Sequence, residues 1–377
     1  MNFYKGVLSP VLDMLDSETW HVRARKALYV ADKVPLGLKI LEFMAGSFQD
    51  PRLRVDLDGV QLRNPIMVGA GWDKTGEAVR GLMALGFSAV EVGTVPAYSQ
   101  EGNPKPRQWM IAPGVCINCL GFNSPGTKAV ARNLRYSLEG WRGLALRIGV
   151  SVGMNKDTLI NDAPVVHAHV IRSLYPYASH FTINVSSSNT PGLRKLQDKK
   201  PLTDILQAVM STVCEKTWNM FQPPVYVKIA PDLTLSAVDD VIQVVADNGA
   251  AGIIACNTTT SPDIKAGYGE RWRNQPGGLS GHDGRYREMC TEMVRHIYRS
   301  TGGRMTVIGV GGVVDASTAL DKIMAGAKAA QVVTAIRGEG PCVAVRINRG
   351  LLAFMDKQGV KNISELVGAE DNPSQVA

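Results

Sequence analysis

This chain of 377 residues lacks the apolar runs that a membrane-spanning protein needs. No stretch of 18 uncharged apolar residues occurs in it, and no basic segment followed by an apolar one stands at its N-terminus. We therefore expect neither a transmembrane helix nor a signal peptide. Histidine is scarce too, with six scattered residues, so no metal site is expected. Two of them, His167 and His169, are predicted to lie on a surface helix.

Cysteine is too sparse to hold the fold together. Six cysteines at irregular spacing do not form a disulfide framework, and a reducing compartment is the better interpretation. Cys116 and Cys119 are the only pair at metal or redox spacing, and we interpret them as free thiols because a second ligand pair is missing. The net charge is +7, but the basic residues form no run interleaved with aromatic ones, which argues against nucleic-acid binding.

What the chain does have, from Pro65 onward, is an alternation of short apolar runs and amphipathic helical stretches. The predicted strands are 66–70, 89–92, 146–152, 181–185, 225–229, 252–255, 306–310 and 330–334, and the predicted helices are 76–85, 127–138, 163–174, 202–213, 237–248, 286–298, 316–325 and 342–354. Eight such pairs favour an α/β fold with a closed (β/α)8 TIM barrel over an open doubly wound sheet. A barrel of this type takes about 250 residues, so an appended segment is expected.

That appended segment precedes the barrel, where residues 3–47 predict two or three short helices. Its large apolar residues are Val7, Leu8, Val11, Leu12, Leu15, Leu36, Leu38, Ile40, Leu41, Phe43 and Met44. Two interpretations fit them: a helical cap packed on the barrel, or an interfacial helix pair that touches a membrane and admits an apolar ligand. Residues 54–63 alternate around Asp58-Gly59, which predicts a hairpin that plugs the amino end of the barrel.

The most unusual stretch, residues 184–190, follows the fourth predicted strand and reads Asn-Val-Ser-Ser-Ser-Asn-Thr. A buried strand with three hydroxyls and two carboxamides at its end has no packing reason to be so polar, and the carboxyl ends of barrel strands carry the active site. Lys74 and Lys228 lie at the ends of two other strands. Because a lysine is costly to bury unpaired, an anionic or electron-rich ligand is implied.

Other loops add to this face of the barrel. The long loop 96–123 is predicted to form a lid, and it contributes Asn118 and Asn123 to a set of carboxamides that suits a small planar ring such as a pyrimidine. The glycine-rich stretches 277–281 and 310–312, together with Thr334, follow the last three strands. Barrels often bind phosphate there, so these stretches predict a phosphorylated cofactor.

With these residues in place, the sequence closely resembles a known family, the class 2 dihydroorotate dehydrogenases, which are membrane-associated and quinone-dependent. The resemblance extends from about residue 3 to residue 368. The motifs that carry it are 69–74 (Gly-Ala-Gly-Trp-Asp-Lys), 93–94, 101–107, 121–123, 184–190, 228–232, 257–259, 277–281, 308–313 and 326–327.

The resemblance implies an enzyme that oxidises dihydroorotate to orotate in pyrimidine synthesis, passes a hydride to FMN and uses a quinone to re-oxidise the flavin. It divides the chain into an N-terminal membrane-associating segment, residues 1–48, and an FMN-binding barrel, residues 49–377. It also implies that Ser187 is the base that removes a proton from the substrate. Serine is a weak base, so hydrogen bonds and a site closed to bulk water must assist it.

The resemblance further implies two sets of binding residues. Those expected to hold the substrate are Lys74, Asn118, Leu120, Gly121, Phe122, Asn184, Asn189, Asn257 and Thr258. Those expected to hold FMN are Ala70, Gly71, Lys74, Thr94, Ser151, Asn184, Lys228, Cys256, Ser280, Gly281, Gly311, Gly312, Val333 and Thr334. Lys228 is expected to stabilise the reduced, anionic flavin.

The quinone, ubiquinone or menaquinone, is expected to enter between the N-terminal helices and the barrel, past His21 and Arg107. The resemblance thus favours the membrane-facing interpretation of these helices. It implies a monomer at a membrane surface, either the cytoplasmic face of a bacterial inner membrane or, in a eukaryote, the mitochondrial inner membrane.

The sequence departs from the usual family residues at five positions. Ser188 replaces a proline, Ser151 an asparagine, Leu120 an aromatic residue or methionine, Cys256 a threonine and Val333 an aromatic residue. Two alternatives stay open: a divergent FMN-dependent oxidoreductase of this fold that acts on another cyclic amide or uses a soluble acceptor, and a catalytically silent barrel that binds FMN or a partner. The soluble class uses cysteine as its base and lacks the N-terminal helices, so Ser187 and residues 3–47 argue against it.

Overall fold

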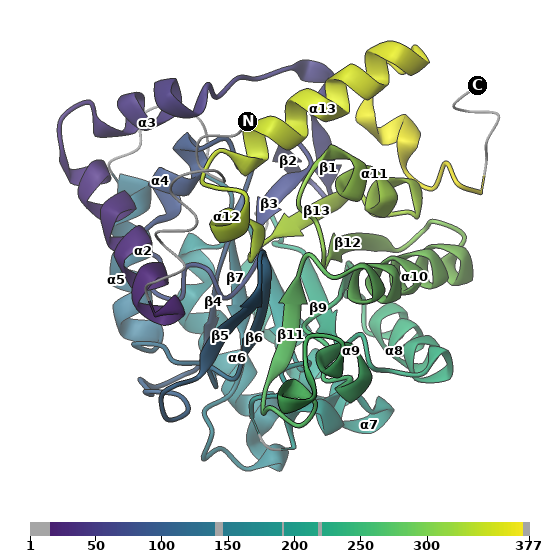
Figure 1. Cartoon of the computed structure of the whole chain (residues 1–377). Coiled ribbons are helices and arrows are strands. Elements are labelled where there is room, and N and C mark those ends of the chain that lie inside the picture. The colour runs from purple at the N-terminus through teal and green to yellow at the C-terminus, as the bar shows by residue number, and fades with distance from the viewer. Residues whose placement is uncertain (1–15, 140–145, 191, 218–220, 372–377) are drawn as a thin grey trace.

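The computed structural model describes residues 16–139, 146–190, 192–217 and 221–371. Eight parallel strands close into a barrel in the order β10-β12-β13-β3-β4-β7-β8-β9, as the (β/α)8 prediction required (Figure 1). They are β3 (Ile66–Val68), β4 (Val90–Val95), β7 (Ile148–Val152), β8 (His180–Asn184), β9 (Val225–Ile229), β10 (Gly252–Ala255), β12 (Thr306–Val310) and β13 (Ala329–Val332). All residues of these strands are buried, because helices cover the barrel outside and side chains fill it inside.

The covering helices each bury one face on the barrel. They are α4 (Val79–Ala84), α5 (Thr127–Glu139), α6 (Ala163–Leu174), α7 (Lys199–Thr217), α8 (Leu235–Asp247), α10 (Gly284–Thr301), α11 (Ala316–Met324) and α13 (Val343–Gln358), with the short α9 (Pro262–Ala266) and α12 (Ala335–Gly338) in the last loops. In α8, Val238, Val241 and Val245 are buried at helical spacing, and the Thr234 hydroxyl caps the first turn. The predicted alternation of strands and helices is therefore confirmed.

A hairpin closes the amino end of the barrel, as predicted. Strands β1 (Val55–Leu57) and β2 (Val60–Leu62) are joined by Asp58 and Gly59, which both have positive φ, as a tight hairpin turn requires. The Asp58 carboxylate accepts hydrogen bonds from the Tyr226 hydroxyl and from the Thr306 hydroxyl, each at 2.7 Å. Tyr226 lies in β9 and Thr306 begins β12, so the turn is fastened directly to the barrel.

The N-terminal segment lies beside the barrel as two helices, α2 (Ser17–Lys33) and α3 (Gly37–Ala45). The first begins at Asp16, whose side chain accepts from the Thr19 N–H, and it buries Trp20. With 17 residues, α2 is longer than the short helices predicted. The apolar positions Val7, Leu8, Val11, Leu12 and Leu15 lie outside the described residues. Among the helices that the structure describes, none is long and apolar enough to span a bilayer.

Two details differ from the sequence predictions. The stretch 277–281 is not only a glycine-rich loop: Gly278–Gly281 forms strand β11, which pairs with β6 (Val115–Asn118), and β6 pairs with β5 (Gln108–Ala112) in a three-stranded antiparallel sheet. His167 is not on an exposed face. It is fully buried because its side of α6 packs on the barrel. Its Nδ1 contacts the Ala163 carbonyl one turn earlier in the same helix.

Candidate active site

A cavity lies at the carboxyl end of the barrel, bordered by the three-stranded sheet and by helix α2. Most predicted site residues line it: Lys74, Asn118, Leu120, Gly121, Phe122, Asn184, Ser187, Asn189, Asn257, Thr258, Ala70, Gly71, Thr94, Lys228, Cys256, Ser280, Gly281, Gly311, Gly312, Val333, Thr334 and His21. Ser151 and Arg107 are not among the lining residues. The Ser151 hydroxyl lies 2.9 Å from that of Thr94, which stands in front of it.

The polar stretch after β8 forms a network at the cavity floor. The Asn184 amide donates to the Thr94 hydroxyl at 2.7 Å, and its carbonyl oxygen accepts from the Ser186 hydroxyl at 2.9 Å. The Asn257 amide, which follows β10, donates to the same Ser186 hydroxyl at 2.9 Å. These bonds join two carboxamides from strands β8 and β10, which lie on either side of β9. Lys228 of β9 pairs with Asn184 between them.

Ser187 follows this network, and its side chain is almost fully buried at the cavity surface. Its Oγ accepts a hydrogen bond from the Asn189 N–H at 3.2 Å, and none of the described residues accepts its own hydroxyl proton. The Asn189 carbonyl accepts from Asn103 of the lid loop at 3.2 Å, and the Asn189 amide lies 3.5 Å from the Asn118 oxygen of β6. The serine hydroxyl is thus held from one side and free to contact a ligand on the other.

The two lysines supply positive charge to the cavity, and burial lowers the pKa of both. The pKa of Lys74 falls to about 8, with the charge of Glu18 opposing the shift. Lys228 has its pKa lowered by burial while the charge of Glu91 raises it. No described residue accepts a hydrogen bond from the Lys74 ammonium group, so it is available to an anionic ligand. Its backbone is set by Asp73, whose carboxylate accepts the N–H groups of the next turn.

Below Lys228, the barrel interior holds a buried polar chain that was not predicted. The Lys228 ammonium lies 3.4 Å from the Gln331 carbonyl oxygen, and the Gln331 amide donates to the Glu91 carboxylate at 2.7 Å. Glu91 also accepts from the Thr182 hydroxyl at 2.9 Å. This chain crosses the barrel from β9 through β13 to β4. It gives the lysine a buried counter-charge without a direct ion pair.

Two basic groups lie where helix α2 meets the cavity, His21 of α2 itself and Arg107 of the lid loop. His21 lines the cavity, its ring Nε2 contacts the Trp72 carbonyl, and burial together with the Lys74 charge lowers its pKa to about 3, so it is neutral. Arg107 instead forms a buried ion pair with Glu18 of α2 at 2.6 Å. This pair joins α2 to the lid loop, so Arg107 acts beside the cavity and not on its surface.

Glycines and hydroxyls from the stretches predicted to bind a phosphate lie together at the cavity. Gly71, Gly281, Gly311 and Gly312 have positive φ, and an added Cβ at Gly71 would meet no atom within 4 Å, so the backbone there opens onto free space. The hydroxyls of Ser280 and Thr334 lie 3.0 Å apart. Backbone N–H groups, hydroxyls and Lys228 form a donor set that fits a flavin with one phosphate.

Several lining residues were given no role in the sequence analysis. They are Trp20, Gln108, Met110, Cys116, Tyr286, Val314, Gln331, Ala335 and Arg337, while the lining residues Trp72, Val310 and Val313 lie in the motifs but were not named as contacts. Gln331 had a usable signal, since it is a single polar residue in an otherwise apolar strand. Arg337 had none, because its place depends on α2: its guanidinium lies over the Trp20 ring at 5.3 Å and donates to the Ser17 hydroxyl.

The described residues contain no group of three His, Cys, Asp or Glu side chains placed to hold a metal ion. Cys116 and Cys119 are free thiols, and burial raises the pKa of Cys116 to about 12. The carboxamides, hydroxyls and lysines that line the cavity suit an organic ligand.

Comparison with known proteins assigns this arrangement to a family. A family model described as "Dihydroorotate dehydrogenase" matches residues 52–355. The chain belongs to the dihydroorotate dehydrogenase family. It is 38% identical over 375 residues to the mitochondrial dihydroorotate dehydrogenase (quinone) of Mus musculus, covering 98% of this chain and 91% of the mouse protein. It is also 38% identical over 362 residues to the Chloroflexus aurantiacus dihydroorotate dehydrogenase (quinone), covering 94% and 98% of the two chains.

Solved structures of the family have the same fold. The crystal structure of DHODH from Eimeria tenella in complex with ferulenol is similar with a TM-score of 0.80 and 30% identity, covering 90% of this chain and 96% of that one. The ligand-free Eimeria tenella DHODH gives a TM-score of 0.79 and 31% identity. The sequence-based recognition of the dihydroorotate dehydrogenase family is confirmed.

Proposed function

We propose that this chain is a quinone-dependent dihydroorotate dehydrogenase that oxidises dihydroorotate to orotate in pyrimidine biosynthesis. The observation that carries the proposal is the buried Ser187 hydroxyl, free of any described acceptor, at the edge of a cavity that also holds four asparagines and two lysines. Membership of the family and the quinone-dependent relatives support the same reaction.

In this proposal, Ser187 takes the proton from the ring carbon adjacent to the one that loses the hydride and passes its own hydroxyl proton to a water molecule, so that it ends the step as a neutral hydroxyl. FMN, when bound, supplies the acceptor for that hydride. The backbone N–H of Asn189 stabilises the negative charge that develops on the serine oxygen as its hydroxyl proton leaves, and the burial of Ser187 keeps bulk water away. Proton and hydride leave neighbouring carbons, so a double bond forms in the ring and orotate results.

Substrate binding follows from charge and hydrogen-bonding capacity. The Lys74 ammonium pairs with the carboxylate, and its lowered pKa of about 8 leaves it largely protonated at neutral pH. Asn118, Asn184, Asn189 and Asn257 match the alternating N–H and C=O groups of the ring. Leu120, Gly121, Phe122 and Thr258 complete the substrate wall.

The remaining lining residues suit FMN. The set comprises Ala70, Gly71, Thr94, Lys228, Cys256, Ser280, Gly281, Gly311, Gly312, Val333 and Thr334. Ser151 acts indirectly in this proposal, because its hydroxyl fixes the Thr94 hydroxyl that lines the cavity. Lys228 stabilises negative charge next to the ring system.

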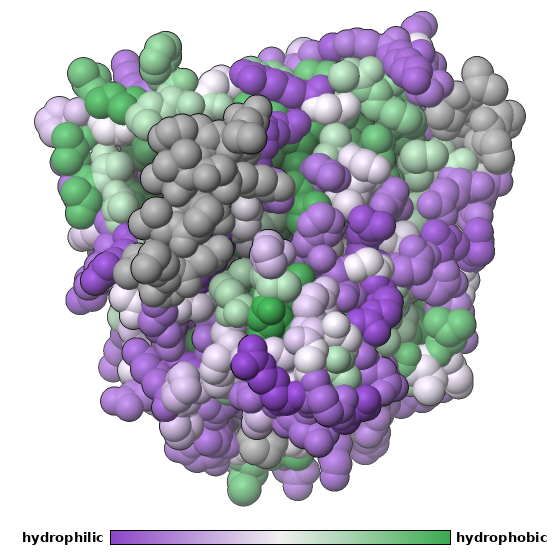
Figure 2. All heavy atoms as spheres, in the orientation of Figure 1, coloured by the Kyte–Doolittle hydropathy of each residue, from purple (hydrophilic) through white to green (hydrophobic). Residues whose placement is uncertain are grey.

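Residues 1–48 form the membrane-associating segment in this proposal, and residues 49–377 form the FMN-binding barrel. The end of α2, helix α3 and the turn between them expose Val30, Val34, Leu36, Ile40, Phe43 and Met44, with Phe43 87% and Met44 72% exposed. Figure 2 shows this hydrophobic surface gathered at the upper left, over α3. The face suits shallow insertion into a lipid surface by a peripheral protein.

Between this face and the barrel, His21 and the Arg107–Glu18 pair border the route by which ubiquinone or menaquinone reaches the flavin. The protein then acts as a monomer on the cytoplasmic face of a bacterial inner membrane, or on the mitochondrial inner membrane in a eukaryote.

The visible spectrum of the purified protein, taken without oxygen before and after addition of dihydroorotate, tests the reaction. A flavin band should bleach on addition of one equivalent. A band that persists would contradict the proposal and favour a related oxidoreductase acting on another cyclic amide.

Ser187→Ala tests the base. The variant should retain its flavin but reduce it about 10² to 10⁴ times more slowly, which is what a base acting in the transition state contributes. Ser188→Ala is the matched control, because the Ser188 hydroxyl donates to the Asn189 side chain and does not line the cavity. Near-normal reduction by Ser187→Ala would exclude it as the base.

Vesicle binding tests the membrane face. Phe43→Glu should weaken co-sedimentation with lipid vesicles at least tenfold, since burying a phenylalanine contributes about 1.5–3 kcal/mol. Val165→Glu, on the exposed side of α6 with 72% of the side chain exposed, is the control. Equal binding by both variants would locate the membrane contact elsewhere.

A further inference from the structure

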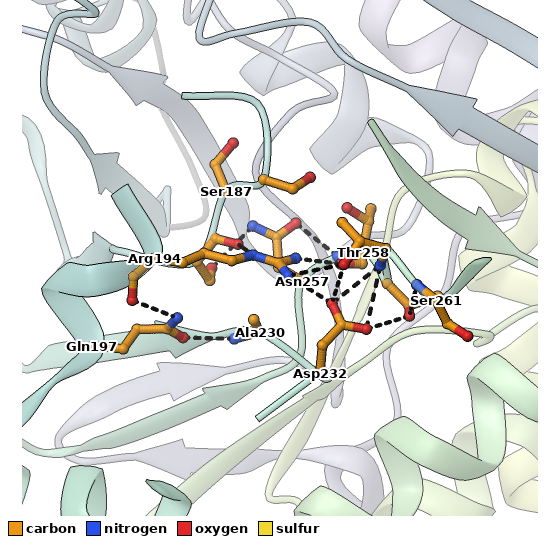
Figure 3. Close-up of polar contacts among 12 residues, drawn as sticks. Ser187, Arg194, Gln197, Ala230, Asp232, Asn257, Thr258 and Ser261 are labelled. Atoms are coloured by element: carbon orange, nitrogen blue, oxygen red, sulfur yellow. Dashed lines mark hydrogen bonds and ion pairs between the residues drawn. The ribbon is translucent and has the colours of Figure 1, made fainter. Parts of the chain in front are cut away.

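Beneath the serine loop lies an arginine that does not line the cavity. Arg194 is in a short 3-10 helix, Leu193–Gln197, that follows the loop. Figure 3 shows its side chain extending below Ser187 toward Asp232. Its Nη1 donates to the Asp232 carboxylate at 2.7 Å, and the two side chains are only 26% and 20% exposed.

The same guanidinium reaches two backbone carbonyls that belong to the site. Its Nε donates to the Ser186 carbonyl at 3.1 Å, and its Nη2 donates to the Thr258 carbonyl at 3.2 Å. One planar group therefore ties the loop after β8 to the loop after β10, while Asp232 anchors it to the loop after β9. A guanidinium can do this because its donors diverge in one rigid plane.

The Ser186 carbonyl matters because of the peptide bond to which it belongs. That planar unit includes the nitrogen and the Cα of Ser187, so a hydrogen bond that fixes the carbonyl also fixes the direction from which the Ser187 side chain projects. No proline stands in the run Ser186-Ser187-Ser188 to restrict its backbone. The orientation of Ser187 must therefore come from contacts such as this one.

Asp232 and Gln197 hold the arginine in place. The Asp232 carboxylate accepts from the Thr259 hydroxyl at 2.5 Å and from the Thr260 N–H at 3.1 Å, so it is fixed before it meets the guanidinium. The Gln197 side chain accepts from the Ala230 N–H at 2.9 Å and donates to the Arg194 carbonyl at 3.1 Å. Both ends of Arg194, backbone and guanidinium, are thus attached to the end of β9.

We infer that Arg194, held by Asp232, is a positioning residue that sets the orientation of the Ser187 hydroxyl toward the substrate. The inference rests on the proposed function, in which Ser187 is the base. Arg194 contacts neither substrate nor flavin in this role. It acts through the Ser186 peptide, and a misplacement of about 1 Å at a reacting group slows a reaction by about 10²-fold.

The test is the rate of flavin reduction by dihydroorotate, followed by anaerobic stopped-flow in the full-length enzyme. Arg194→Lys keeps the charge but loses the divergent donors, and it should slow reduction about 10- to 100-fold. Re-oxidation by a quinone and the dissociation constant of orotate should change less than twofold. Arg172→Lys is the matched control, because Arg172 forms an exposed ion pair with Glu215 between α6 and α7.

A double-variant cycle separates positioning from general stability. In a Ser187→Ala background, Arg194→Lys should slow reduction no further, because the group that it orients is gone. Equal slowing in both backgrounds would overturn the inference, as would a weaker orotate affinity with an unchanged reduction rate. Asp232→Asn provides a second variant should Arg194→Lys lose its flavin, and it should show the same dependence on Ser187.

The outcomes also separate this inference from the proposed function. If dihydroorotate fails to bleach the wild-type flavin, the proposed function is wrong. If the wild type and Arg172→Lys are reduced at the same rate and Arg194→Lys and Asp232→Asn match them, only the positioning role is wrong.

Discussion

Acidification should weaken the docking of helix α2 on the barrel, because His21 binds a proton more readily when the helix is undocked. His21 is partly buried against Trp72, and the loss of solvent around its ring, together with the nearby Lys74 charge, lowers its pKa from 6.5 to about 3. When α2 is undocked, the histidine regains its ordinary pKa and binds a proton below about pH 6.5. Because the undocked state binds more protons, the stability of docking is complete above pH 6.5 and falls as the pH decreases toward 3.

The size of the effect follows from proton linkage. Between about pH 7.5 and pH 5.5, docked His21 stays neutral while undocked His21 becomes protonated, and docking loses about 1.4 kcal/mol, a tenfold change in the ratio of undocked to docked helix. Glu18 does not contribute in this range. Burial raises its pKa, but the hydrogen bonds and charge of Arg107 outweigh burial and leave the pKa below 4.5.

Hydrogen exchange of the α2 amides, corrected for the intrinsic effect of pH, measures this ratio. Protection of residues 20–33 should fall about tenfold between pH 7.5 and pH 5.5. His21→Gln retains a donor for the Trp72 carbonyl and cannot titrate, so it should lose the pH dependence. Unchanged protection in the wild type, or the same fall in His21→Gln, would refute the reasoning.

Three further predictions concern the scaffold of the site. The two Asp73 carboxylate oxygens accept four backbone N–H groups. Asp73→Asn replaces one of these oxygens by a donor, so it should destabilise the protein by about 1–3 kcal/mol in a denaturant titration and weaken flavin retention, whereas unchanged values would contradict the anchoring role. Tyr226→Phe removes the hydrogen bond to Asp58 and should lower the free energy of unfolding by about 1.5–3 kcal/mol in the same titration. A decrease below about 0.5 kcal/mol would mean that other contacts hold the hairpin on the barrel. Gly277→Ala should lower both the melting temperature and the flavin content, because its φ is +101° and its Cβ would stand 2.1 Å from the Asn118 carbonyl oxygen; normal flavin content would show that the strand pairing tolerates the change.

The barrel could be predicted because each of its strands is a short apolar run bounded by polar residues. Two strands show how far the pattern reaches: Val225–Ile229 and Thr306–Val310 have the predicted bounds. The boundaries of α4 could not be predicted, since residues 76–78 bond to the Asp73 carboxylate in a turn and the helix begins only at Val79.

Most of the cavity wall could also be predicted, because its residues follow the strands directly and resemble family motifs. Residues placed by tertiary contacts could not. Strand β11 forms by pairing with β6 of a distant loop. The positions of Arg337 and Arg107 are set by contacts with α2, a hydrogen bond to Ser17 and an ion pair with Glu18. Ser151, which was predicted to hold FMN, does not line the cavity, and its hydroxyl lies 2.9 Å from the Thr94 hydroxyl on the neighbouring strand β4.

The three-stranded sheet over the cavity limits which segments of this enzyme can be exchanged with those of a relative. Strands β5 and β6 come from the loop after the second barrel strand, whereas β11 comes from the loop after the sixth, and Gly278 of β11 pairs with Asn118 of β6. If this chain is recombined with a relative at any point between residues 118 and 278, strands β5 and β6 come from one protein and strand β11 from the other. Exchanges of whole segments with relatives should therefore succeed only when both loops are inherited together.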